Sequence, residues 1–120
     1  MDAKSWNEQG NILFKEQNYQ GALDAFKQAI ALDNKYAQAW NNLGNTLAQL
    51  NRQPEALGAY DRAIGLSPNY HQAWYNRGVL LEEMGAYGNA VECFNRAIAL
   101  EEDPLYFHRR DGIWVKKKLF

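Results

Sequence analysis

Apolar residues recur along the chain at spacings of three and four, which is the period of an amphipathic helix. They fall into paired runs separated by short polar or turn-forming stretches. In residues 37–70 the first run covers about residues 37–50, and the second starts near Pro54 and Glu55. Proline and acidic residues are both favoured in the first turn of a helix. The pattern therefore predicts helical hairpins and an all-α fold.

The hairpin pattern returns every 34 residues, and eight columns of side chains keep this step. Such a period indicates a repeat architecture. We predict three repeats, over about residues 3–36, 37–70 and 71–104, and a lone final helix over about residues 104–118. The columns are Trp6, Trp40, Trp74; Gly10, Gly44, Gly78; Leu13, Leu47, Leu81; Ala22, Ala56, Ala90; Phe26, Tyr60, Phe94; Ala29, Ala63, Ala97; Ile30, Ile64, Ile98; and Leu32, Leu66, Leu100.

The repeated glycines lie inside predicted helices, where glycine costs about 1 kcal/mol against alanine. We expect each glycine to let the paired helix approach closely at the small alanines of the Ala22 column, with the tryptophan filling the wedge beside them. Ser67 and Asp103 each precede a proline, which predicts an N-cap and a new helix at both places. Gly85 is expected to end the first helix of the third repeat.

The second repeat resembles the tetratricopeptide repeat in the order and spacing of its motif. The matching residues are Trp40, Leu43, Gly44, Ala56, Tyr60, Ala63 and Pro68. The resemblance implies a right-handed superhelical solenoid of three helix-turn-helix hairpins plus a C-terminal capping helix, forming a single domain over residues 1–120. It also implies that the first helix of each hairpin lines a concave surface.

Composition places few limits on this interpretation. The chain is 47% apolar and 22% charged, and its formal net charge is −1. We therefore expect a soluble protein without general attraction to nucleic acid or to an anionic membrane. The single cysteine, Cys93, has no intramolecular partner, and no secretion signal is visible, so a cytoplasmic location is expected.

The final helix allows two interpretations. In the first interpretation the helix is a solenoid cap, which covers the third hairpin with Phe107, Ile113 and Trp114. Alternatively, the chain was cut from a longer array, and Val115, Leu119 and Phe120 lack their cover, in which case self-association is expected to give a homo-oligomer through this helix. As a cap, the helix would turn these basic residues to water: Arg109, Arg110, Lys116, Lys117 and Lys118.

The predicted concave stripe is rich in asparagine, which is a poor helix former and suggests binding. Side-chain amides can pair with the N–H and C=O groups of an extended peptide, and the stripe resembles the asparagine ladder of some family members. Simple hydration of these side chains is the alternative. The residues expected to contact a peptide are Asn7, Asn11, Asn41, Asn42, Asn45, Tyr75, Asn76, Tyr106, Arg109 and Arg110.

The family's carboxylate clamp is matched only in part, because most of its cations are missing. Arg109 or Arg110 remains a candidate to hold an acidic group. No catalytic residue, metal site or cofactor motif is predicted: His71 and His108 lack neighbouring ligands, and Cys93 is expected in the core. We thus expect a non-catalytic adaptor whose partner is a protein or peptide. A self-associating assembly module and a recruiting or regulatory region of a larger enzyme are the alternatives.

Overall fold

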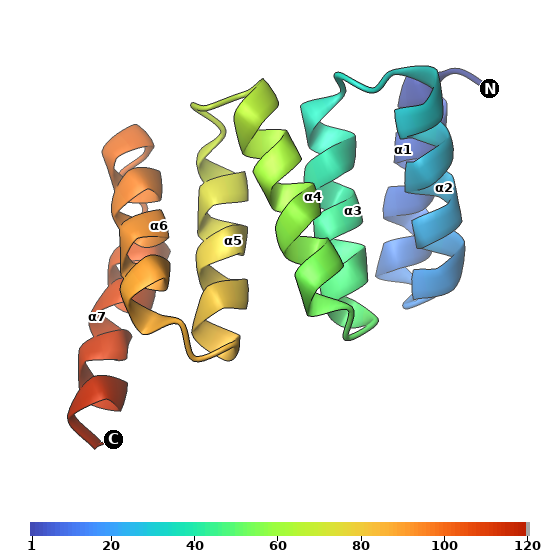
Figure 1. Cartoon of the computed structure of the whole chain (residues 1–120). Helices are drawn as coiled ribbons and strands as arrows, with labels where there is room; N and C mark the ends of the chain where they lie inside the picture. Colours follow the sequence, from blue (N-terminus) through green and yellow to red (C-terminus); the bar gives the residue numbers. More distant parts are fainter. Residues whose placement is uncertain (120) are drawn as a thin grey trace. The chain divides into compact units, whose positions relative to one another are not determined.

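A computed structural model describes the backbone of residues 1–119 and the side chains of residues 1–116. The expectations for Lys117, Lys118, Leu119 and Phe120 lie outside these described side chains. Within the described part the chain is all helical, as predicted, and no strand occurs (Figure 1). The helices are α1 (Ala3–Lys15), α2 (Tyr19–Leu32), α3 (Ala37–Gln49), α4 (Gln53–Leu66), α5 (His71–Glu83), α6 (Tyr87–Leu100) and α7 (Pro104–Leu119).

The helices group into two compact units, Met1–Pro68 and Asn69–Phe120. In the first unit α1 pairs with α2, α3 pairs with α4, and α2 also packs against α3. In the second unit α5 pairs with α6, and α7 packs against α6 (Figure 1). The three predicted hairpins and the lone final helix are therefore present. That residues 1–120 form one domain stays a prediction.

The repeated glycines make room for aromatic rings, which corrects the expectation that they face the Ala22 column. A Cβ atom placed on Gly10 would lie 2.5 Å from Cε1 of Phe26, and one on Gly44 would lie 2.6 Å from Cε1 of Tyr60. Gly78 has the same relation to Phe94, at 2.7 Å. Each ring is buried over the backbone of the preceding helix. In each hairpin, an aromatic ring of the second helix thus packs directly on a glycine of the first.

The tryptophans are only half-buried, so the expectation that they fill an interior wedge was wrong. Trp40 shows why its indole stays near the surface: Nε1 donates a hydrogen bond of 2.9 Å to the backbone oxygen of Asn34. The guanidinium of Arg62 lies 5.2 Å from the ring centre, and Arg96 is placed similarly over Trp74 at 5.5 Å. A cation above the ring face stabilises a partly exposed indole.

The first helix of each hairpin ends at an equivalent left-handed residue. Backbone φ is +63° at Gln17, +60° at Asn51 and +81° at Gly85, and these positions are 34 residues apart. This conformation ends a helix and is least strained for glycine. The prediction that Gly85 ends a helix is confirmed.

Two predicted helix starts have different outcomes. At Asp103–Pro104, α7 begins at the proline, and the Asp103 carboxylate accepts a hydrogen bond of 2.9 Å from the backbone N–H of Leu105. At Ser67–Pro68 the expectation was wrong, because Ser67 is the C-cap of α4 and α5 begins only at His71. Pro68 lies in the turn that follows α4, so a serine–proline pair alone did not identify the helix start.

The final helix buries positions one residue earlier than α3 and α5 do, the first helices of the second and third repeats. The second and third repeats bury their third and tenth positions: Ala39, Thr46, Ala73 and Leu80. In α7 the equivalent residues are Phe107, which is half-buried, and Trp114, which is 63% exposed. The buried side chains are instead Tyr106 and Ile113. Of the three predicted covering residues, only Ile113 is buried as expected, and Trp114 corrects the prediction.

Candidate functional site

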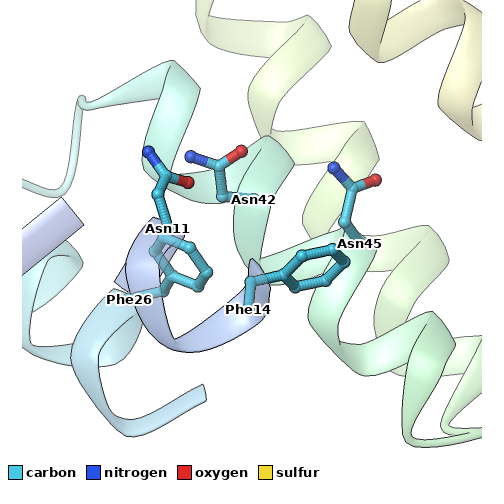
Figure 2. Close-up of a pocket in the computed structure, with 5 residues that line it drawn as sticks. All are labelled: Asn11, Phe14, Phe26, Asn42 and Asn45. Carbon is cyan, nitrogen blue, oxygen red and sulfur yellow. The ribbon is translucent and has the colours of Figure 1, made fainter. Parts of the chain in front are cut away.

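The first unit contains a small hollow between its helices (Figure 2). Asn11 and Phe14 from α1, Phe26 from α2, and Asn42 and Asn45 from α3 line it. Its volume is about 40 Å³, which is room for a water-sized group. The two rings form apolar walls, and the three amides give the hollow donors and acceptors. The structure thus brings together three of the asparagines that the sequence predicted to bind.

Asn42 is held in one orientation by a chain of hydrogen bonds. Its Nδ2 donates to Oδ1 of Asn7 over 3.0 Å, and Nδ2 of Asn7 donates to the Tyr36 hydroxyl over 3.3 Å. Because its amide nitrogen is engaged with Asn7, Asn42 offers its oxygen as an acceptor. Asn7 itself is buried, so the prediction that it contacts a ligand needs correction: it positions Asn42.

Asn45 lies one helical turn after Asn42, on the same face of α3. Its Oδ1 accepts a hydrogen bond of 2.6 Å from the Tyr60 hydroxyl, which leaves the amide nitrogen as the exposed donor. Figure 2 shows the Asn45 nitrogen on the side nearer to Asn42, and the Asn42 oxygen on the side nearer to Asn45. One face of α3 therefore presents a fixed acceptor and a fixed donor side by side.

Asn11 differs from these two asparagines because its side chain is exposed. Within the described residues, no hydrogen bond fixes its amide, which lies beside Asn42 in Figure 2. A freely turning amide can act as donor or acceptor. Asn41, by contrast, is buried, and its predicted role as a ligand contact needs the same correction as that of Asn7.

In the second unit, Tyr106 of α7 is buried against α5. Its ring stacks on Tyr75 with centres 4.8 Å apart, and its hydroxyl lies 2.7 Å from Nδ1 of His71. Burial and the nearby charge of Asp103 raise the pKa of Tyr106, so the phenol stays protonated. The structure therefore corrects the prediction for Tyr106, which fastens α7 to α5 and is not open to a ligand. Tyr75 remains half-exposed at the edge of this contact.

Arg109 is engaged in an ion triad inside the second unit. Its Nε donates a hydrogen bond of 2.9 Å to Glu82, whose side chain is 5% exposed, and Lys116 binds the other carboxylate oxygen. Burial alone would raise the pKa of Glu82, but the hydrogen bonds from Lys116 and Arg109 outweigh it and lower the pKa. Burial would likewise lower the pKa of Arg109, which the Glu82 hydrogen bond raises. The carboxylate that Arg109 holds is the chain's own.

Arg110 is also engaged within the second unit. It donates hydrogen bonds to Asn95 on α6 over 3.0 Å and to Asp111 over 3.2 Å, and its guanidinium lies 5.3 Å from the Phe107 ring centre. Asn76, the remaining predicted residue, is half-exposed on α5. The two predicted cations thus hold α7 in place, and their contact with a ligand stays a prediction.

Sequence reasoning missed the side chains that orient the amides. Tyr60 was recognised only as a core aromatic, and Tyr36 was given no role, although both fix an amide of the site. A signal was present for Tyr60, since its column holds phenylalanine in the other repeats. The added hydroxyl in the second repeat indicates a buried polar partner. Within the described residues, no cluster of three metal-ligating side chains occurs, and no helix is long and apolar enough to cross a membrane.

Comparison with known families agrees with the fold. Two sequence profiles, each described as a tetratricopeptide repeat, match residues 7–71 and residues 43–111. Each match covers more than half of the chain, and the chain therefore belongs to the tetratricopeptide repeat family. Among proteins whose functions have been curated, none matches this sequence at a significant level.

Several solved structures share the fold. The first tetratricopeptide domain of Spaghetti (RPAP3), bound to the HSP90 peptide SRMEEVD, superposes with a TM-score of 0.93 at 20% identity, covering 98% of this chain and 94% of that one. The Arabidopsis OM64 tetratricopeptide domain superposes with a TM-score of 0.86 at 22% identity, with 91% of both chains covered. MamA superposes with a TM-score of 0.79 at 31% identity, covering 84% of this chain and 59% of that one.

Proposed function

We propose that this protein is a non-catalytic interaction module that holds an extended peptide segment against the asparagine-lined hollow of its first unit. The observation that carries the proposal is the fixed pair on α3, an acceptor oxygen on Asn42 beside a donor nitrogen on Asn45. A peptide bond offers the complementary pair, one N–H donor and one C=O acceptor. Such a contact reads the main chain and leaves the side chains of the partner largely unspecified.

The preset orientation of the two amides supports this proposal. Asn7 and Tyr60 hold them before any ligand arrives, so binding loses less side-chain freedom than it would with mobile amides. The rings of Phe14 and Phe26 give the hollow apolar walls that displace water from the new hydrogen bonds. The matching domain of Spaghetti (RPAP3), which holds the HSP90 peptide SRMEEVD, supports peptide binding as the use of this fold.

An acidic peptide end is not required by the proposed contact. Arg109 already binds Glu82, and Arg110 is hydrogen-bonded to Asn95 and Asp111. Using either cation for a ligand would first require breaking these bonds. Main-chain recognition by the first unit therefore carries the affinity in this proposal.

The test is peptide binding measured with a donor-deleting variant. An array of unrelated extended peptides, including SRMEEVD, is screened first, and the best binder is then titrated by calorimetry. Asn45→Asp keeps an acceptor for the Tyr60 hydroxyl but removes the N–H donor, so affinity should fall about tenfold or more. Gln28→Ala, an exposed amide on α2, is the matched control and should bind normally.

The peptide itself provides a second arm of this test. N-methylation of one main-chain nitrogen at a time removes single donors, and one position should lose affinity with the wild type but not with Asn42→Ala. Equal affinity of Asn45→Asp and the wild type would refute the proposal, as would a wild type that captures no peptide. The cytoplasmic location, self-assembly and a place within a larger enzyme stay predictions.

A further inference from the structure

The ring-on-glycine contact occurs three times in this chain, and a fourth glycine continues the series. Gly112 follows Gly78 by 34 residues and lies on α7. Gly10, Gly44 and Gly78 each receive a ring from the following helix, with less than 3 Å between the ring and a placed Cβ. At Gly112, apart from its chain neighbours and the backbone of its own helix, no described atom lies within 4 Å of such a Cβ. The fourth notch is therefore open.

The side chains around this notch also continue the columns of the repeats, but they are exposed. Val115 occupies the column of Leu47 and Leu81, which are buried in their hairpins, yet Val115 is 61% exposed. Leu105 lies on the same face of α7 as Gly112, because the two are seven residues apart, and it is 49% exposed. Within the described structure no helix lies over this face of α7, so its apolar side chains are turned outward.

We propose that this outward face of α7 binds an amphipathic helix of a partner protein, and that an aromatic residue of that helix enters the notch at Gly112. The face continues an interface that the chain already builds three times, and the occupant is defined by that interface. Each of α2, α4 and α6 carries an alanine four residues before its aromatic residue and another alanine three residues after it. The partner helix is expected to carry the same pattern. This surface lies apart from the hollow of the first unit and does not depend on the proposed function.

Charge defines one further position of the partner. In the third hairpin, Arg77 donates a hydrogen bond of 3.0 Å to Sγ of Cys93, the residue directly before the aromatic Phe94. The position of Arg77 is occupied in α7 by Asp111, which is largely exposed and whose Oδ1 accepts a hydrogen bond of 3.2 Å from Arg110. A helix docked in the same geometry would place its corresponding residue beside this carboxylate. The partner therefore carries lysine or arginine immediately before its aromatic residue.

The probe is a capped synthetic peptide with the sequence of residues 87–100, in which Cys93→Lys supplies the basic residue. Two matched peptides carry Cys93→Glu at the same position, or Cys93→Lys together with Phe94→Ala. Binding to the full chain is followed by NMR, through the backbone amide signal of Gly112. The basic aromatic peptide should bind, and loss of the ring should weaken binding about tenfold or more, as removal of a central aromatic anchor does. The acidic peptide should bind more weakly, and added salt should reduce the difference.

The decisive protein variant is Gly112→Ala. The new methyl group meets no described atom beyond its own helix backbone and chain neighbours, so the helix should gain stability. The methyl group also fills the notch and should weaken binding of the peptide about tenfold or more. Gly58→Ala is the matched control: it also meets no atom within 4 Å, lies in α4, and should raise stability without changing peptide binding.

Three outcomes would overturn this inference. The basic peptide does not shift the Gly112 signal, or Gly112→Ala binds it as tightly as the wild type does. The third is that the chain alone forms a dimer that Val115→Lys dissociates and that the peptide also dissociates, which would make a second copy the occupant. Sedimentation of the wild type and of this variant distinguishes that case.

Discussion

Substitution of Gly44 by alanine tests the packing on which the hairpins and the site both depend. The new Cβ would lie 2.6 Å from Cε1 of Tyr60, so the ring would have to retreat by about 0.8 Å to reach the 3.4 Å of ordinary contact. Overpacking of this kind costs about 1–3 kcal/mol. Disturbing the 2.6 Å hydrogen bond from Tyr60 to Asn45 adds about 1 kcal/mol, and the better helix propensity of alanine returns about 1 kcal/mol. The net expectation is a loss of about 1–3 kcal/mol.

Urea unfolding followed by far-UV circular dichroism measures this loss. Gly58→Ala, where a Cβ meets nothing within 4 Å, should instead gain up to about 1 kcal/mol. In a Tyr60→Ala background the ring is absent, so Gly44→Ala should no longer be destabilising, and the double-mutant cycle isolates the ring contact. Equal or higher stability of Gly44→Ala in the wild-type background would refute the packing argument.

Two further predictions concern the ion triad and the hairpin turns. Glu82→Gln should lower the free energy of unfolding by about 1–2 kcal/mol at neutral pH, less than for a fully buried pair because both cations can turn to water. Because its folded pKa is lowered, the Glu82 contribution is complete above its unfolded pKa of about 4.5 and is lost as the pH falls through the folded pKa. The difference in unfolding free energy between wild type and Glu82→Gln should therefore shrink between pH 7 and about pH 3, and a constant difference would contradict this. Gln17→Gly should raise stability by about 0.5–1 kcal/mol, since φ there is +63°, and Gly85→Gln should lower it, which thermal unfolding of both variants checks.

The helix pairs followed from the sequence because periodicity and the 34-residue step reflect local chain geometry. The partners of the glycines did not follow, since a column of small residues and a column of aromatic residues are equally regular in sequence. Gly44 meets the ring of Tyr60, and only coordinates show which column lies opposite. Spacing along one helix predicts a shared face, but it does not identify the residue across the interface.

The candidate site was predicted in part for the same reason. Asn11, Asn42 and Asn45 were expected on one stripe, and the structure gathers them around one hollow. Asn7 was placed on that stripe as well, although it is buried and serves to orient Asn42. Burial of a polar residue depends on a partner from another part of the chain, which in this case includes Tyr36, the N-cap residue of α3, 29 residues away in the sequence.

The rotation of α7 was beyond sequence reasoning because it depends on competition between two helix faces. Trp114 continues the column of Thr46 and Leu80, which are buried, and was expected to be covered. The observed arrangement instead favours the bonds of Arg109 and Lys116 to Glu82 and the stacking of Tyr106. Periodicity treats every apolar residue alike and cannot compare the burial of one tryptophan with an ion triad around a buried carboxylate.

The buried thiol of Cys93 gives the second unit a natural chemical reporter. It is the single cysteine of the chain, it lies in α6 with 1% exposure, and it contacts Arg77 across the hairpin. A disulfide reagent can reach the sulfur only when α5 and α6 separate, so the rate of its modification measures how often this hairpin opens. The local opening of the third hairpin can thus be followed in the unaltered protein, without labels and without a signal from the other two hairpins.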